Sequence, residues 1–307
     1  MLDTLTGFAV VALAIIVGYV VGRINLLGDS ARYVLARLTF FVLTPFLLFV
    51  ILAEADTTLL FSSLLPASAA AAVIVMALFA LVSRLLWRRP LGESVIGSLA
   101  SGYVNANNIG FPISLYLLGN AAFPAPVILL QLIVFAPIAL TLLDVARSEK
   151  GVSLWKILRR TATNPIVLGA IAGTLVSISG IELAPIVVEP MRLLADACIP
   201  VLLISYGLSL HGARVLGQPG HRRDIVLASI LKLVAMPVIG WVLAQFVFQL
   251  PPGEVLIIVV LAALPTAQNV FNYAQRYDAG EVIARDTIFI TTIGCVPVLL
   301  LATALLG

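Results

Sequence analysis

The chain has 307 residues, of which 61% are hydrophobic and 11% are charged. A soluble domain carries about 25% charged residues, so this composition excludes an ordinary soluble protein. The 18 Lys and Arg residues only slightly exceed the 15 Asp and Glu residues. The two cysteines and two histidines lack the spacing of a disulfide framework or a zinc motif, so we expect no metal site and no cofactor.

Ten apolar segments of membrane-spanning length follow one another along the chain. A helix of about 20 apolar residues crosses the ~30 Å hydrocarbon core of a bilayer. We therefore predict an all-α polytopic membrane protein with ten transmembrane helices. The first segment lacks the basic region and cleavage site of a signal peptide, so we expect it to be retained. The segments lie at about 5–22, 36–53, 63–84, 94–118, 124–144, 164–180, 190–210, 224–248, 253–274 and 285–306.

The basic residues are concentrated in alternate connections between these segments. Sixteen of the 18 lie in the connections that follow segments 1, 3, 5, 7 and 9, whereas the other connections carry acids such as Glu54 and Glu254. The positive-inside rule then predicts a multi-pass protein of the plasma membrane, in bacteria the inner membrane, with both termini extracytoplasmic. The excess of Lys and Arg over Asp and Glu is explained by this topology and gives no support to nucleic-acid binding.

Two short polar stretches interrupt the fourth and ninth apolar segments. One is GYVNANNIGFP at 102–112, the other is ALPTAQNVFNY at 263–273, and Asn108 and Asn269 stand 161 residues apart. Because Pro112 and Pro265 lack a backbone N–H, we expect interrupted helices with freed carbonyls at both places. Interrupted helices at corresponding places in two halves of a chain indicate the binding site of a transporter.

The correspondence between the two halves extends beyond the polar stretches. Gly119 falls on Gly280 at the same spacing, and Arg37 falls on Arg192 at 155 residues. Each half holds five predicted spans, and an odd number of spans gives the two halves opposite orientations. We therefore predict a 5+5 inverted repeat, with a first five-helix repeat at 1–150 and a second at 151–307.

These features resemble the auxin efflux carrier family. The resemblance rests on the ten spans as 5+5, on the proline-bearing polar segments 4 and 9, and on Leu231-Lys232-Leu233 with Met236-Pro237 in segment 8. It implies the fold of bile-acid/sodium symporters: a scaffold domain and a transport domain, with helices 4 and 9 broken and crossing at mid-membrane. It also implies transport of small organic anions, auxin-like or malonate-like, and is compatible with a homodimer.

Amide and hydroxyl side chains in the polar stretches are the candidate substrate-binding groups. Broken helices expose N–H groups that suit a carboxylate, and amides offer both donors and an acceptor. In the alternative interpretation these side chains only hold the helices together. The candidates are Asn105, Asn107, Asn108, Pro112, Pro265, Thr266, Gln268, Asn269 and Asn272.

Ion coupling has separate candidates, and the sequence leaves sodium coupling, proton coupling and uncoupled transport open. Asp196 is an intramembrane carboxylate that is also spaced to pair with Arg192 on the same helix face. Lys232 either supports a helix terminus or attracts the anion, and Asp286 is expected to cap the last helix. The coupling candidates are Asp196, Gln131, Thr291 and Thr292; a threonine there completes a cation site or bonds back to its own helix.

The sequence favours a secondary transporter of a small organic anion, a mono- or dicarboxylate, that works by alternating access. A sodium- or proton-coupled carrier of an amino acid or a neutral solute is the alternative, and a membrane receptor without transport is a third hypothesis. The chain has no zinc-protease motif and no Walker phosphate loop, so we predict neither an enzyme nor a primary pump.

Overall fold

The computed structural model describes residues 2–28, 30–54, 64–147, 159, 162–181, 183–210 and 219–307. Helices make up most of these residues, and two extended stretches meet in an isolated bridge between Val104 and Thr266. The chain divides into two compact units: unit 1 comprises 1–62, 107–126 and 158–213, and unit 2 comprises 63–106, 127–157 and 214–307. Each unit draws on both halves of the chain. The predicted repeats 1–150 and 151–307 stay a prediction, because most of the connection between them lies outside the described residues.

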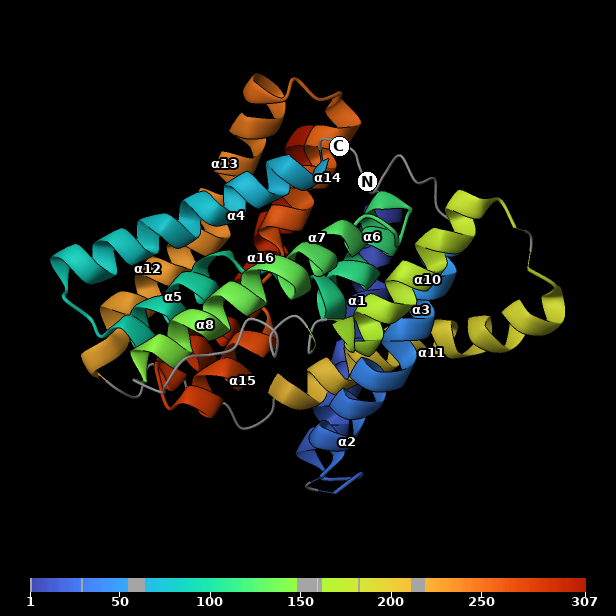
Figure 1. Ribbon diagram of the computed structural model, residues 1–307, viewed down its shortest axis with the longest axis horizontal. Helices are drawn as coiled ribbons and strands as arrows, with labels where there is room; N and C mark the ends of the chain where they lie inside the picture. The colour runs from blue at the N-terminus through green and yellow to red at the C-terminus, as the bar shows by residue number, and fades with distance from the viewer. Residues whose placement is uncertain are drawn as a thin grey trace. The chain divides into compact units, whose positions relative to one another are not determined.

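Unit 1 consists of helices that approach one another closely at glycines. α1 packs against α11, and α3 packs against α10 and α11 (Figure 1). A side chain at Gly169 or Gly173 of α10 would collide with the backbone of α3 at Pro45 and Phe49. Small residues serve this purpose in membranes, where close packing replaces the hydrophobic effect between helices. The elements of unit 1 are α1 (Leu2–Arg23), α2 (Ala31–Leu38), the π-helix η1 (Thr39–Leu43), α3 (Thr44–Glu54), α6 (Phe111–Leu118), α10 (Pro165–Ser179) and α11 (Pro185–Leu210).

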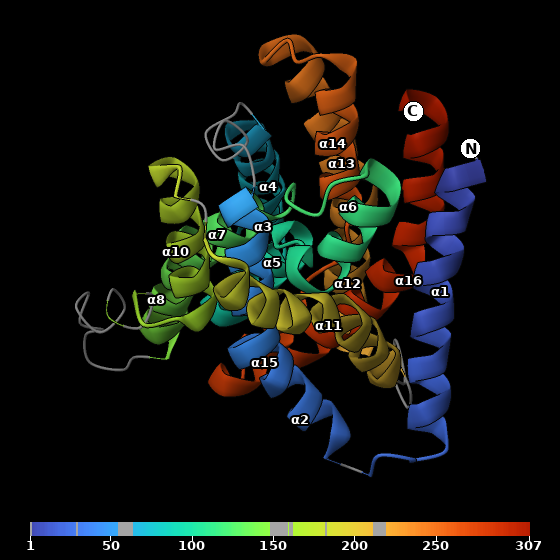
Figure 2. The same cartoon turned by 90° about the vertical axis from the view of Figure 1, so that its right-hand side faces the viewer.

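Unit 2 surrounds α14, which is buried from Ile257 to Ala263. α13 and α14 lie side by side, and α4 packs against α5 (Figure 2). The elements of unit 2 are α4 (Leu64–Leu81), η3 (Val82–Leu86), α5 (Leu91–Gly102), α7 (Ala125–Leu130), η5 (Gln131–Phe135), α8 (Ala136–Ala146), the 3₁₀-helix η6 (Pro219–His221), α12 (Arg222–Ile230), η7 (Leu231–Ala235), α13 (Met236–Val242), η8 (Leu243–Val247), α14 (Pro252–Ala263), α15 (Gln268–Tyr277) and α16 (Glu281–Leu306).

A π-helical turn comes before four of the prolines. A proline donates no hydrogen bond and its ring clashes with the carbonyl four residues earlier. A wider turn with i→i+5 bonds relieves that clash, so these helices continue through the proline instead of ending. The turns are η1, η4 (Ala106–Gly110), η5 and η7, and they end two residues before Pro45, Pro112, Pro137 and Pro237 respectively.

Local backbone geometry recurs at a spacing of 161 residues. The positive φ of Arg88 (53°) recurs at Gln249 (51°), and the left-handed Gly119 (73°) recurs at Gly280 (62°). The 12-residue helices α5 and α14 both follow a proline with nearly the same backbone angles. This spacing is the one that separates Asn108 from Asn269, so the two halves share local structure as well as sequence.

Five helices are long and apolar enough to cross a membrane, counted over the described residues alone. Three shorter apolar helices accompany them: Ala12–Arg23, Pro165–Ser179 and Pro252–Ala263. The prediction of an all-α protein with several membrane-length helices is confirmed, whereas the number of ten stays a prediction. The five helices are Tyr33–Glu54, Leu64–Leu86, Ala125–Ala146, Arg222–Val247 and Glu281–Leu306.

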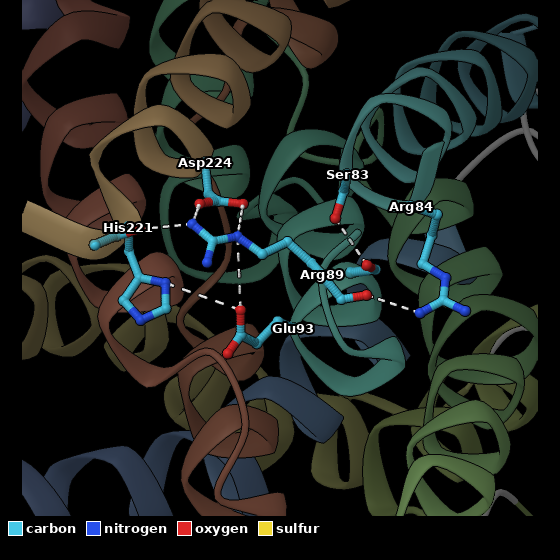
Figure 3. A network of polar contacts seen from close by, with 8 residues as sticks. Ser83, Arg84, Arg89, Glu93, His221 and Asp224 are labelled. Atoms are coloured by element: carbon cyan, nitrogen blue, oxygen red, sulfur yellow. Dashed lines mark hydrogen bonds and ion pairs between the residues drawn. The ribbon is translucent and has the colours of Figure 1, made fainter. Parts of the chain in front are cut away.

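One end of unit 2 carries the ionic cluster (Arg89, Glu93, His221 and Asp224; Figure 3). Arg89, just before α5, donates to both carboxylate oxygens of Asp224 in α12, at 3.2 Å from Nε and 2.6 Å from Nη2. The side chain of Asp224 is fully buried, whereas that of Arg89 is 25% exposed. Glu93 Oε2 lies 3.9 Å from Arg89 Nε and 3.9 Å from His221 Nδ1. The cluster therefore ties the start of α5 to the start of α12.

Candidate functional site

Two extended stretches in unit 2, the paired breaks (103–105 and 264–267), follow the ends of α5 and α14. They run antiparallel. The N–H of Asn105 donates to the carbonyl of Pro265 at 2.8 Å, and the N–H of Ala267 donates to the carbonyl of Tyr103 at 3.0 Å. Each break thereby satisfies backbone groups of the other, as the interior of a membrane requires.

Three of the sequence-predicted residues hold the paired breaks in place. The hydroxyl of Thr266 donates to the carbonyl of Ala100 at 2.5 Å, and its N–H donates to Thr291 Oγ1 at 3.1 Å. Gln131 Nε2 donates to the carbonyl of Val104 at 3.1 Å. All three side chains are buried. Their polar groups bond to the backbone in this conformation, which is the arrangement expected of side chains that fix the breaks.

Lys232 brings a positive charge to the same region. Its side chain is fully buried, and Nζ donates to the carbonyl of Ala262 at 2.6 Å. Met236 Sδ lies 3.1 Å from the same nitrogen. Ala262 belongs to the last turn of α14, whose carbonyls have no partner within their own helix. The ammonium group therefore lies at the negative end of the α14 dipole, where a cation is stabilised.

The N-terminus of α15 begins directly after the second break. No side chain caps it, and Ala267 leads into it with extended backbone (φ −71°, ψ 142°). The N–H groups of such a first turn suit an anion. Gln268 and Asn269, in this turn, are half-buried. The buried Tyr103 lies close enough to Tyr273 and Asn269 to interact with both side chains, so amide and phenol groups gather on one side of α15.

A narrow cavity lies beside the paired breaks within unit 2. It is lined by Ser68, Gly102 and Val104 together with Gln131, Met236 and Ala262, among others. Ser68 Oγ is buried there without a hydrogen-bond partner among the described residues. The space admits about one water molecule, so it is too small for an organic anion in this conformation.

The remaining candidates from the fourth segment belong to unit 1. Asn107 Nδ2 donates to Asn108 Oδ1 at 3.0 Å, and both side chains are partly buried. Pro112 is buried near the start of α6, after the π-turn η4. The helix is thus interrupted at 103–105 rather than at Pro112, because the π-turn accommodates this proline. Pro265, in contrast, lies inside a break as expected.

Three other predicted residues lie outside this arrangement. Asn272 is exposed on α15, and Thr292 donates to the carbonyl of Ile288 in its own helix at 2.6 Å. Asp196 is exposed on α11 in unit 1, where Arg192 pairs with Glu54 and Glu189.

The expected cap at Asp286 needs a correction. α16 begins at Glu281 after the left-handed Gly280, which places Asp286 sixth in the helix. Asp286 is fully buried and accepts from Arg285 Nε at 2.8 Å. The carboxylate of Asp286 is therefore placed inside the helix packing and not at the N-terminus of α16.

Sequence reasoning missed the partners that position the candidates. The carbonyls of Ala100, Val104 and Ala262 are the acceptors for Thr266, Gln131 and Lys232. A backbone carbonyl has no sequence signal of its own. The only available signal was the length of the apolar run before each break, which locates the last turn of α5 and of α14.

Comparison with known proteins agrees with this architecture. The family described as "Membrane transport protein" matches residues 4–303. A protein of Rhizobium meliloti (strain 1021), named "Putative malonate transporter", is 29% identical over 226 residues, which cover 72% of this chain and 69% of that protein. The residues matched by the family include both paired breaks.

Proposed function

The chain belongs to the membrane transport protein family, that of the auxin efflux carriers, and we propose that it is a secondary transporter of a small organic anion. Membership makes it a multi-pass membrane transporter rather than an enzyme. The substrate class proposed is a mono- or dicarboxylate. Malonate is the first compound to test, because it is the one in the name of the relative from Rhizobium meliloti.

The observation that carries this proposal is the chemistry around the paired breaks. An uncapped helix N-terminus, half-buried amides at Gln268 and Asn269, and the charge of Lys232 lie in one compact unit. All of these favour an anion, since N–H groups and ammonium groups are donors with positive potential. The amides would also distinguish one anion from another by the positions of its hydrogen-bonding atoms, which a site that relies on charge alone would not do.

Alternating access follows from the proposed inverted repeat. The recurrence of unusual backbone angles at a spacing of 161 residues supports two related halves. Five spans in each half give them opposite orientations in the membrane, and such repeats form transporters that expose one site to each side in turn. We place the chain in the bacterial inner membrane with both termini outside the cytoplasm, on the charge bias of its connections; a homodimer is compatible with this arrangement.

The test is uptake of labelled malonate, succinate and indole-acetate by purified protein in liposomes. We expect uptake of at least one of them that is saturable and competed by the unlabelled anion. Asn269→Ala removes an amide beside the α15 N-terminus. A hydrogen bond to a charged group contributes about 1.5–3 kcal/mol, so uptake should fall about tenfold or more at low substrate concentration.

Gln275→Ala is the matched control, because Gln275 is an exposed amide two turns further along the same helix. It should leave uptake unchanged. Equal uptake by Asn269→Ala and wild type would remove α15 from the binding site. Absence of uptake or exchange for every carboxylate, by protein with a sharp thermal transition, would contradict the anion assignment.

A further inference from the structure

Lys232 is a buried cation whose partners are backbone and sulfur rather than a carboxylate. Its ammonium group donates to the carbonyl of Ala262 at 2.6 Å and contacts Met236 Sδ at 3.1 Å. Among the described residues, no carboxylate forms an ion pair with it. Burial of a charge is costly unless something compensates it. The compensation here comes from the carbonyl end of a helix, through a short charge-assisted hydrogen bond.

The carbonyl end of a broken helix is also the kind of place where carriers coordinate a coupling sodium ion. Sodium requires several oxygen ligands at once, and three backbone carbonyls beside the breaks already accept hydrogen bonds from side chains of the protein. Gln131 bonds to the carbonyl of Val104 and Thr266 bonds to that of Ala100, while Thr291 accepts the N–H of Thr266. The positive charge at the end of α14 is supplied by the protein itself.

We propose that the ammonium group of Lys232 takes the place of a coupling sodium ion at the carboxyl end of α14, so that this transporter moves its anion without sodium. The inference deepens the proposed transport function and rests on it. Lys232 acts as a positioning residue: its charge holds the end of α14 in the geometry that pairs the breaks. It also offsets part of the charge of the incoming anion.

The cavity beside the breaks makes the idea testable by chemical rescue. Both groups that contact Nζ, Ala262 and Met236, line that cavity. Lys232→Ala would therefore extend it by the volume of the lost side chain, leaving room for a small cation next to the carbonyl of Ala262. Lys232→Met fills the same volume without a charge and leaves no such room.

The transport experiment measures malonate uptake into liposomes in sodium chloride and in choline chloride. Wild type should be equally fast in both salts. Lys232→Ala and Lys232→Met should each lose about tenfold or more, since an uncompensated carbonyl end is left in the membrane interior. Sodium or n-propylammonium should restore part of the activity of Lys232→Ala only. Thr303→Val, which removes a hydroxyl that bonds within its own helix, should stay near the wild-type rate.

A thermal experiment tests the inference independently of substrate. A ligand that binds only the folded state raises the melting temperature. At constant ionic strength, sodium or n-propylammonium should raise the melting temperature of Lys232→Ala, and neither should raise that of wild type or Lys232→Met. The inference is overturned if wild type needs sodium for uptake or is stabilised by it, or if Lys232→Met transports normally. Failure of wild-type uptake in both salts, with the expected thermal pattern, would count against malonate as the substrate and not against the role of Lys232.

Discussion

The ionic cluster and the paired breaks both join distant parts of the chain within unit 2, but they do so with different chemistry. Arg89 and Asp224 are 135 positions apart and meet through charges. Ala100 and Thr266 are 166 positions apart and meet through a neutral hydroxyl and a carbonyl. At the breaks the backbone bonds to itself, and the amino group of Lys232 bonds to the carbonyl end of α14.

The difference follows from access to water. Arg89 keeps a quarter of its side chain exposed, so part of its solvation survives and the pair costs less to assemble. Thr266 is fully buried, where a neutral tie avoids the desolvation of two ions. Under the proposed function, ties without carboxylates, as in the bonds of Thr266 and Gln131, would avoid like-charge repulsion with a substrate carboxylate. The neutral hydrogen bond of Thr266 thus holds the breaks without adding a charge to them.

Arg89→Met should have the largest effect on stability, because it leaves the buried carboxylate of Asp224 without its bidentate partner. Removing one partner of a buried pair costs about 3–5 kcal/mol, and the partial exposure of Arg89 places the expected loss near the lower end of that range. Thermal unfolding in detergent would show it as a clear drop in melting temperature.

The matched control for this change is Arg192→Met, which breaks an exposed arginine–carboxylate pair in unit 1. Exposed pairs contribute little, so its melting temperature should stay close to that of wild type. Arg89→Met combined with Asp224→Leu should recover part of the loss. Equal decreases in melting temperature for Arg89→Met and Arg192→Met would contradict the expected difference between a buried and an exposed ion pair.

Thr266→Val should have an intermediate effect. It keeps the shape of the side chain but leaves the carbonyl of Ala100 without its donor, at a cost of about 1–3 kcal/mol for a buried polar group. The loss should appear in the melting temperature and in malonate uptake together, because the same bond positions both breaks. Thr303→Val removes a hydroxyl that bonds within its own helix and serves as the control. A stable but inactive Thr266→Val protein would instead indicate that the hydroxyl contacts the substrate directly.

Gln131→Leu should have the smallest effect of the three. The lost bond to the carbonyl of Val104 is longer, at 3.1 Å, and a neutral hydrogen bond contributes about 1 kcal/mol. If Gln131 only holds the first break in place, uptake by the variant should be slower, but its dependence on sodium concentration and on pH should match that of wild type. A changed ion dependence in this variant would return Gln131 to the coupling role predicted from the sequence.

The apolar helices could be located from the sequence because a run of about twenty apolar residues has the length and polarity of a membrane-spanning helix. The sequence also located the polar stretches correctly, since amides stand out among aliphatic side chains. The first interruption lies inside the predicted stretch, at 103–105, but not at Pro112, because a π-turn accommodates that proline within the helix. The second interruption coincides with Pro265.

The structure brings only some of the candidate residues together, and for a related reason. Thr266, Gln131 and Thr291 all bond to groups of the paired breaks or of the helix before them. Their partners are backbone N–H and carbonyl groups, which have no signal in the sequence. Asp286 was expected at a helix start because the last apolar segment was predicted to begin at 285, whereas α16 begins at Glu281, directly after the left-handed Gly280. Such positions depend on the turn geometry before the helix, which sequence patterns describe poorly.

The π-turn η7 has a geometric consequence for the two ends of its helix. An α-helix advances by about 100° per residue, so the one extra residue of a π-turn shifts the angular phase of everything before it relative to everything after it. Asp224 and Lys232 lie before or within η7, and Pro237 lies just after it. Replacing Pro237 with a residue that permits an ordinary turn would rotate the first half of this helix about its axis. Asp224 would then turn away from Arg89 and Lys232 away from Ala262 in a single step, so one proline sets the alignment of both contacts.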